Sequence, residues 1–284
     1  SSGLSVVQTL LADGTFIPRA ITRNCSSEKA LKLKNLGAEV AQADLWDIGS
    51  LKQALSGVET VYGVSSISSK GMTDYYLSQQ RNATWQDVDA DKATDVKYFI
   101  WSSLPHCTRV SNGKYANVYH FDNKANVDDY LRESGIPHSI LYTGKQFFIL
   151  SVFRVVQYSC ACDRLELTVA RHDAQTPEYF TWFERGLNQC ALALLKHYKD
   201  PESEVISRTF YAFRYVIKTQ EFVDSIFLLP SALGKPVSFV SSATTGIQFG
   251  LYPGTVIPGP RLINLGVKFH TTEEFSQEIK GRYA

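Results

Sequence analysis

The sequence lacks an excess of charge of either sign, because 29 lysine and arginine residues stand against 28 aspartate and glutamate residues. Direct nucleic-acid binding usually requires a basic surface, so we expect none. A long apolar run is also missing. The most apolar region, residues 136–157, is interrupted by Lys145, Gln146 and Arg154. A membrane-spanning helix needs about 20 nearly uninterrupted apolar residues, so this region is predicted to be core and no membrane partner is expected.

Paired cysteines are scarce too. The five cysteines are scattered along the chain, which is typical of free thiols in a reducing compartment. Only Cys160 and Cys162 lie close together, and a C-x-C pair without a second pair or a nearby histidine predicts no metal site. The first residues show no basic stretch followed by an apolar core, the pattern of a secretion signal. These features together predict a cytoplasmic protein.

The first half of the sequence alternates helix-like and strand-like segments. We expect helices over 3–12, 24–36 with its cap, 48–55, 73–92 and 121–133, and strands over 16–22, 38–43, 58–65, 97–103 and 137–142. Strands separated by helices at this spacing predict right-handed β-α-β crossovers and a parallel sheet. Such a sheet normally opens with a strand, whereas this sequence opens on a helix, so a first strand is expected to be absent.

The second half shows a less regular pattern. It predicts a helix over 189–198, strands over 210–217 and 236–241, and helix starts near residues 219 and 271. We therefore divide the chain into a dinucleotide-binding core, residues 1–150, and a smaller mixed lobe, residues 151–284, that contributes segments back to the core.

Several residues stand where a dinucleotide would be held in such a core. Gly3 opens the first helix, where the last glycine of a phosphate-binding turn belongs, although a glycine there is also a common cap. The strand over 16–22 ends Thr22-Arg23-Asn24 with no carboxylate to bond a ribose 2′-hydroxyl. Arginine suits a 2′-phosphate, so NADP(H) is favoured over NAD(H), with a solvated loop charge as the alternative for Arg23. Asp44 follows the next strand and either faces the adenine or caps a helix.

The order of several segments resembles the NmrA-like family, which are atypical relatives of the short-chain dehydrogenases. These segments include LLADG (10–14), RAITRN (19–24), LGAEVAQADLWD (36–47), VKYFIWSSL (96–104), HFDNK (120–124), SGIPHSILYTG (134–144) and LGKPVSFV (233–240). The resemblance implies an α/β, Rossmann-like, doubly wound parallel sheet that binds NAD(P). It also implies contacts by Gly3, by Thr22 and Arg23 at the 2′-phosphate, by Asp44 and Leu45 at the adenine, by Ser65 under the cofactor, by Lys124 at the nicotinamide ribose and by Phe147 near the nicotinamide.

The sequence departs from true dehydrogenases at one position. Those enzymes use Tyr-x-x-x-Lys, in which the phenol exchanges the proton during hydride transfer and the lysine lowers its pKa. Here the matching frame is His120 to Lys124, and Tyr119 lies one residue out of frame. His120 either lines the pocket without chemistry or donates a proton near neutral pH. No catalytic residue is assigned, with His120 and Lys124 as the pair to test if the protein is an enzyme.

Three functions follow from these observations. The first, on the family pattern, is a redox-sensing regulatory protein that binds NAD(P)(H) and acts through protein contacts without turnover, in the cytoplasm and also in the nucleus. Its protein partner, by family analogy, is a transcription factor or an enzyme. The second is an NAD(P)H-dependent reductase acting on a small carbonyl or related substrate. The third is a truncated relative that binds no dinucleotide.

Overall fold

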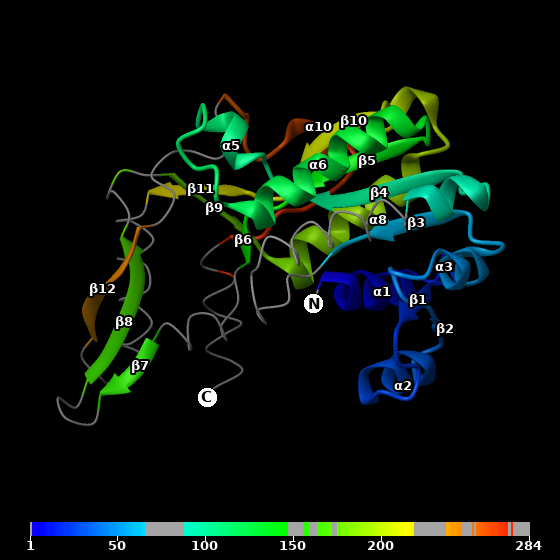
Figure 1. Cartoon of the computed structure of the whole chain (residues 1–284), viewed down its shortest axis with the longest axis horizontal. Helices are drawn as coiled ribbons and strands as arrows, with labels where there is room; N and C mark the ends of the chain where they lie inside the picture. The colour runs from blue at the N-terminus through cyan, green and yellow to red at the C-terminus, as the bar shows by residue number, and fades with distance from the viewer. Residues whose placement is uncertain are drawn as a thin grey trace.

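The computed structural model describes residues 2–65, 88–146, 156–159, 164–171, 175, 177–218, 237–245, 252, 254–271 and 274. Helices and strands alternate through the first half as the sequence predicts (Figure 1). The helices of this half, together with those that return to the core, are α1 (Ser2–Asp13), α2 (Glu28–Asn35), α3 (Ile48–Leu55), α5 (Cys107–Val110), α6 (Tyr119–Ser134), α8 (Asn188–His197) and α10 (Pro260–Asn264). Residues 88–93, the described end of the helix expected over 73–92, are helical. Among the described helices, none is long and apolar enough to cross a membrane.

Six parallel strands of the core form two sheets. The strands are β1 (Arg19–Thr22), β2 (Glu39–Gln42), β3 (Thr60–Gly63), β4 (Tyr98–Ser103), β5 (His138–Tyr142) and β10 (Arg208–Tyr211). β1 pairs with β2, and the other four are ordered β10-β5-β4-β3, with every neighbouring pair parallel. Within the described ranges, no strand pairs with the second edge of β1 or of β3. The expectation that a first strand is absent remains a prediction.

Helix boundaries follow local hydrogen bonding. The Asp47 carboxylate accepts hydrogen bonds from Gly49 N at 2.9 Å and Ser50 N at 3.2 Å, which caps α3 at its first residues. Gly135 ends α6 in the left-handed conformation at φ 79°, where a side chain would be strained. These signals are readable in the sequence, so the expected and observed limits of α3 coincide.

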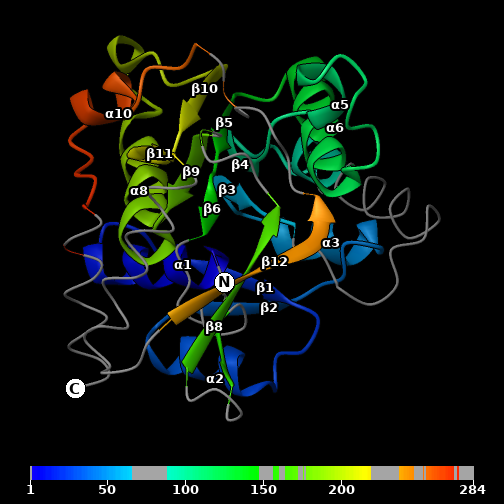
Figure 2. The same cartoon turned by 90° about the vertical axis from the view of Figure 1, so that its left-hand side faces the viewer.

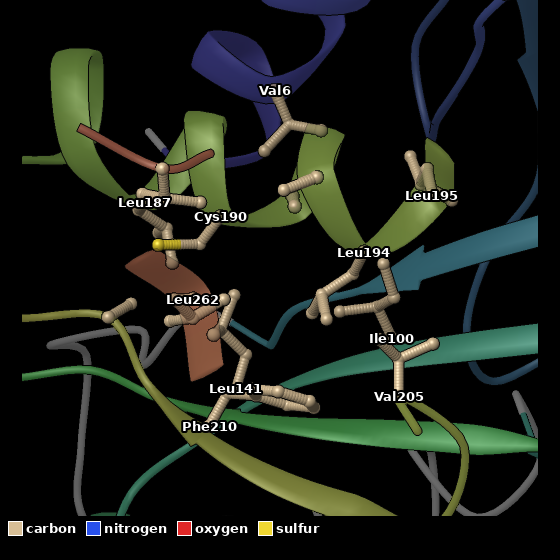
Figure 3. Close-up of a cluster of buried hydrophobic side chains, with 14 of the residues drawn as sticks. Val6, Ile100, Leu141, Leu187, Cys190, Leu194, Leu195, Val205, Phe210 and Leu262 are labelled. Atoms are coloured by element: carbon tan, nitrogen blue, oxygen red, sulfur yellow. The ribbon is translucent and has the colours of Figure 1, made fainter. Parts of the chain in front are cut away.

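β4 is the centre of the core and is buried on both faces. Alternate side chains of a strand point to opposite faces, so Ile100 and Tyr98 pack with α1 and α8 while Trp101 and Phe99 pack with α6. Figure 3 shows the first of these clusters, in which Ile100 lies among leucines of α8 and side chains of β5 and β10. Helices therefore cover both faces of the four-stranded sheet, which confirms the doubly wound α/β fold (Figure 2).

The rest of the chain forms two small mixed sheets. One contains β11 (Tyr215–Lys218), β9 (Pro177–Thr181) and β6 (Lys145–Gln146), and the other contains β12 (Val237–Thr245), β8 (Arg164–Arg171) and β7 (Val156–Ser159). Figure 1 shows β7, β8 and β12 at the end of the molecule away from β3 and β4. A short π-helix, η1 (Phe183–Leu187), leads into α8, and a 3₁₀ turn, η2 (Pro201–Ser203), follows it.

One expected strand, residues 210–217, is wrong as a single element. The structure divides it between β10, which pairs parallel with β5, and β11, which pairs antiparallel with β9. Ala212 and Phe213, at the junction, are buried, so the apolar pattern continues through the break while the chain changes sheet. The expected helix starts near residues 219 and 271 lie wholly or partly outside the described residues.

Candidate functional site

The carboxyl ends of β1 and β2 bring the predicted adenosine-side residues together. Thr22 is paired in register with Gln42, and Ala43 N donates to Thr22 O at 3.1 Å, so Arg23 and Asp44 follow adjacent strands at one sheet edge. In open parallel sheets, ligands bind at this carboxyl edge. The Thr22 hydroxyl accepts a hydrogen bond from Asn24 N at 3.2 Å, and this bond closes the turn that carries Arg23.

Arg23 is exposed and makes no ion pair within the part of the chain that the structure describes. Arg19, the first residue of β1, forms an ion pair with Glu39 at 2.6 Å and donates a hydrogen bond to the backbone oxygen of Ala54 at 2.9 Å. Of these two arginines, Arg19 is therefore structural, and Arg23 is the guanidinium left available at the end of β1. A guanidinium in that position is suited to bidentate contact with a phosphate.

Asp44 does not cap α3, because Asp47 fills that role. The Asp44 carboxylate accepts from Trp46 N at 3.1 Å, and Asp44 N donates to the Ser50 hydroxyl at 3.1 Å. Leu45 is half-buried and packs against the cluster beneath α3. Of the two roles weighed for Asp44, the capping role is thus occupied by another residue, and the turn geometry holds the carboxylate at the edge of the site.

The beginning of α1 lies over the ends of β3 and β4. A Cβ added to Gly3 would be 3.7 Å from Val64 Cγ1, so Gly3 and the Val64–Ser65 segment after β3 are neighbours. Burial raises the pKa of Tyr62 to about 12, against the opposing effect of the adjacent Ser102 and Ser2 hydroxyls. The free N–H groups at the start of a helix carry partial positive charge, which favours an anion at this position. Contact at 3.7 Å is ordinary, so the packing here does not itself require glycine at residue 3.

Lys124 projects from α6 onto the end of β4. Its Nζ donates to Ser102 O at 2.9 Å and lies 5.4 Å from the centre of the Trp101 ring. The lysine is 9% exposed, and burial lowers its pKa to about 8, with the carboxyl of Asp128 opposing that shift. The residue predicted to reach the nicotinamide ribose thus stands at the carboxyl end of β4.

His120 lies one turn before Lys124 on α6. Its ring packs edge-on against Phe121 at 4.8 Å between centroids, and the side chain is half-buried. Burial lowers the pKa of His120 below its ordinary value of 6.5, although Asp122 acts in the opposite direction. The imidazole is therefore mainly neutral at pH 7, which weakens it as a proton donor in the place of the missing phenol.

Asp122 connects α6 to α5. Its carboxylate accepts from Thr108 N at 3.3 Å, bonds the Thr108 hydroxyl, and lies 3.1 Å from His106 Nδ1. His106 also caps α5, since Arg109 N approaches the same Nδ1 at 3.3 Å. This arrangement fixes the loop after β4 against the helix that carries His120 and Lys124. The sequence carries no signal for this contact, because α5 is only four residues long and has no periodicity.

Two further residues at the site were missed from the sequence, Asp128 and Tyr142. The Tyr142 hydroxyl, at the end of β5, donates to Asp128 Oδ2 at 2.9 Å. Asp128 is 1% exposed, and burial raises its pKa to about 7. The available signal was the spacing, because an acidic residue four positions after Lys124 shares its face of a helix.

Some predicted positions lie outside the described residues. Phe147, Cys160 and Cys162 are among them, so their roles remain predictions. Within the described ranges, no group of three or more histidine, cysteine, aspartate or glutamate side chains is placed to hold a metal ion.

The fold and this edge define a Rossmann-like α/β protein of the dinucleotide-binding type. The sequence pattern of the NmrA-like family matches residues 1–177, and the chain belongs to that family. The predicted family resemblance is thereby confirmed.

Curated relatives share about a third of their aligned residues with this chain. An NmrA-like family domain-containing protein of Dictyostelium discoideum is 32% identical over 132 residues, which are 46% of this chain and 41% of the relative. An NmrA-like family domain-containing oxidoreductase of Aspergillus japonicus is 34% identical over 132 residues, 45% of this chain and 38% of the relative. The aligned part thus spans about two fifths of the length of these relatives.

Solved structures share the fold at low identity. NmrA, a negative transcriptional regulator, in complex with NADP superposes with a TM-score of 0.77 at 16% identity, covering 100% of this chain and 93% of that protein. The triphenylmethane reductase of Citrobacter sp. complexed with NADP(H) gives a TM-score of 0.68 at 16% identity, covering 96% and 94%. The fold is thus common to a regulator and to a reductase, and does not distinguish between them.

Proposed function

We propose that this protein binds NADP(H) along the carboxyl edge of its parallel strands and acts as a redox-sensing regulator through protein contacts, without turnover. The observation that carries the cofactor assignment is the placement of Lys124, buried at the end of β4 with its ammonium directed at Ser102 O. The exposed Arg23 and the start of α1 supply two further positive groups, which suit the phosphates of a dinucleotide. When bound, NADPH would supply a hydride.

The state of His120 is the reason for proposing a function without turnover. Hydride transfer to a carbonyl needs a proton donor beside the developing alkoxide. Position 120 holds a half-buried imidazole whose lowered pKa keeps it mainly neutral at pH 7, in place of a phenol. The groups suited to hold a dinucleotide, such as Lys124, are therefore present, whereas the proton-donating phenol of the dehydrogenases is replaced by His120.

A second candidate is an NAD(P)H-dependent reductase. It is favoured by the curated relatives from Aspergillus japonicus and Aspergillus flavus, both described as oxidoreductases. Of the two, the regulator is preferred here because of the state of His120. Both candidates share the cofactor and differ in whether the hydride is delivered to a small substrate.

The test is calorimetric titration of the 284-residue chain with NADP, NADPH and NAD. Micromolar affinity, equivalent to about 8 kcal/mol, is expected for NADP and NADPH, with weaker binding of NAD. Binding is then followed by assay of NADPH consumption with quinones and small carbonyl compounds. Consumption that is abolished by His120→Ala would replace the regulator with the reductase. A folded chain that binds none of the three dinucleotides would contradict both.

A further inference from the structure

Lys124 and Asp128 are two ionisable side chains buried on the same face of one helix. They are four residues apart on α6, a spacing that places side chains one above the other. Lys124 reaches Ser102 O on β4 at 2.9 Å, and Asp128 accepts from Tyr142 on β5 at 2.9 Å. The pair therefore lies across the carboxyl ends of two adjacent strands, within the candidate dinucleotide site.

The carboxyl of Asp128 is only half satisfied. Oδ2 bonds Tyr142, whereas Oδ1 is buried and has no hydrogen-bond partner of normal geometry among the residues the structure describes. A buried carboxylate with an unpaired oxygen is costly, so it needs a compensating positive charge. On the same helix, Arg132 supplies part of that charge and Asp129 opposes it, while the Ser103 hydroxyl on β4 lies beside the carboxyl.

The environment of Lys124 is mainly uncharged. On β4 it meets the ring of Trp101 and a backbone oxygen, and the charged group acting on it is Asp128. Burial brings the two pKa values close together, to about 8 for Lys124 and about 7 for Asp128. The two groups therefore change charge over overlapping pH ranges, and Asp128 favours the charged form of Lys124.

We propose that Asp128 is a positioning residue that keeps the Lys124 ammonium charged in its buried position, and that binding of an anionic dinucleotide beside Lys124 is coupled to pH-dependent proton uptake from solvent by this pair. The inference rests on the proposed cofactor binding. The proton balance is simple: a solvent proton joins the Nζ lone pair or a carboxylate oxygen, and no other bond forms or breaks. Binding at this site would then be linked to pH.

Tyr142 acts on Lys124 indirectly, through its hydrogen bond to Asp128. Burial and the neighbouring Asp128 raise its pKa, so the phenol stays protonated and donates to the carboxylate. Its ring packs against the rings of Tyr211 and Tyr252, at 5.8 and 5.7 Å between centroids. Loss of the hydroxyl makes ionised Asp128 less stable, and hence weakens the support for the Lys124 ammonium.

The experiment measures NADPH affinity between pH 6 and pH 9.5, together with proton uptake from calorimetry in buffers of different ionisation enthalpy. Wild-type affinity is expected to fall as the pH rises through about 8. Asp128→Asn should move that fall to lower pH by about one pH unit, because burial of the ammonium is then unopposed. Tyr142→Phe should move it in the same direction by less. Glu133→Gln, which removes an exposed carboxylate from the same helix, is the matched control and should leave the profile unchanged.

An unchanged pH midpoint in Asp128→Asn, with binding intact, would overturn the inference. If the asparagine variant fails to fold, Tyr142→Phe carries the same comparison. The pair is also tested without cofactor, by urea unfolding of Lys124→Met, Asp128→Asn and the double variant. Non-additive effects support the coupling, and additive effects overturn it even if NADPH binds. A wild-type chain that binds no NADPH but shows non-additive unfolding would contradict the proposed function while leaving the Lys124–Asp128 pair in place.

Discussion

Trp101 and Lys124 hold each other through two different contacts. The indole Nε1 donates to the backbone oxygen of Lys124 at 3.2 Å, and the lysine ammonium lies 5.4 Å from the centre of the indole ring. The hydrogen bond fixes α6 to β4, and the contact between the ammonium and the indole ring stabilises the positive charge of the lysine. The lysine is thus positioned by β4 before any ligand arrives.

Replacement of this lysine should affect all dinucleotides alike. Lys124→Met is expected to weaken NADP, NADPH and NAD by about tenfold to a hundredfold, since a hydrogen bond from a charged group contributes about 1.5–3 kcal/mol. Calorimetric titration measures the change, and Lys114→Met, on an exposed turn, is the control. Unaltered affinities in a folded Lys124→Met variant would remove the lysine from the site.

Arg23 should discriminate between cofactors. Arg23→Ala is expected to weaken NADP by about tenfold or more and NAD by much less, because only NADP carries the 2′-phosphate. The comparison of both titrations with those of Lys29→Ala, an exposed lysine of α2, separates a specific contact from a general loss of positive charge. An equal loss for NADP and NAD would assign Arg23 to a non-specific role.

The buried carboxyl of Asp128 should also appear in the pH dependence of stability. Its folded pKa of about 7 lies above the ordinary value of 3.8, so the folded state binds this proton more tightly than the unfolded state does. The stability that this proton contributes is present at low pH and is lost as the pH rises through about 7. Asp128→Asn should therefore gain stability relative to wild type between pH 4 and pH 7, by about 1 kcal/mol or more.

Urea unfolding at several pH values measures this difference. Lys124→Met should alter the pH dependence of stability in a different range, between about pH 8 and pH 10.5, because burial lowers the folded pKa of Lys124 from 10.5 to about 8. The stability linked to this lysine is present above pH 10.5 and is lost as the pH falls through about 8. A constant difference between Asp128→Asn and wild type from pH 4 to pH 7 would show that the carboxyl is not perturbed.

Gly63 should be less tolerant of substitution than Gly3. A Cβ at residue 63 would lie 2.5 Å from Phe99 Cζ and 3.1 Å from Trp101 Cε3, and both rings are buried in the core. Gly63→Ala is therefore expected to cost about 1–3 kcal/mol of unfolding free energy. Gly3→Ala, whose Cβ would meet Val64 at an ordinary 3.7 Å, is the matched substitution and should change stability little. Equal unfolding midpoints for the two variants would contradict this packing.

The limits of prediction from sequence differ between the two halves of the chain. Asp47 before α3 and Gly57 after it are signals in the local sequence, so the predicted helix over 48–55 has the observed bounds. The division of residues 210–217 between two sheets depends on which strands lie beside them, and Ala212 and Phe213 carry no glycine or proline signal at the break. The apolar periodicity of these residues predicts one strand, but pairing with two different neighbouring strands divides them into β10 and β11.

The same distinction applies to the site. Lys124 and His120 were identified because their spacing on a helix is a sequence property, and Arg23 because it ends a strand. Asp128 was missed because its importance depends on burial beneath Tyr142, which comes from another strand. The neutral state of His120 likewise depends on its surroundings in the fold.

The separation of β1 and β2 from the four-stranded sheet has a mechanical consequence. Arg23 and Asp44 follow the strands of one sheet, whereas Lys124, on α6, contacts β4 of the other, and within the described residues no backbone ladder joins the two sheets. The amides of β4, packed on both faces, should exchange with deuterium only on global opening, whereas those of β1 and β2 should exchange through smaller, local openings. A dinucleotide that contacts both sheets would link them directly, and its binding should therefore slow hydrogen exchange in β1 and β2.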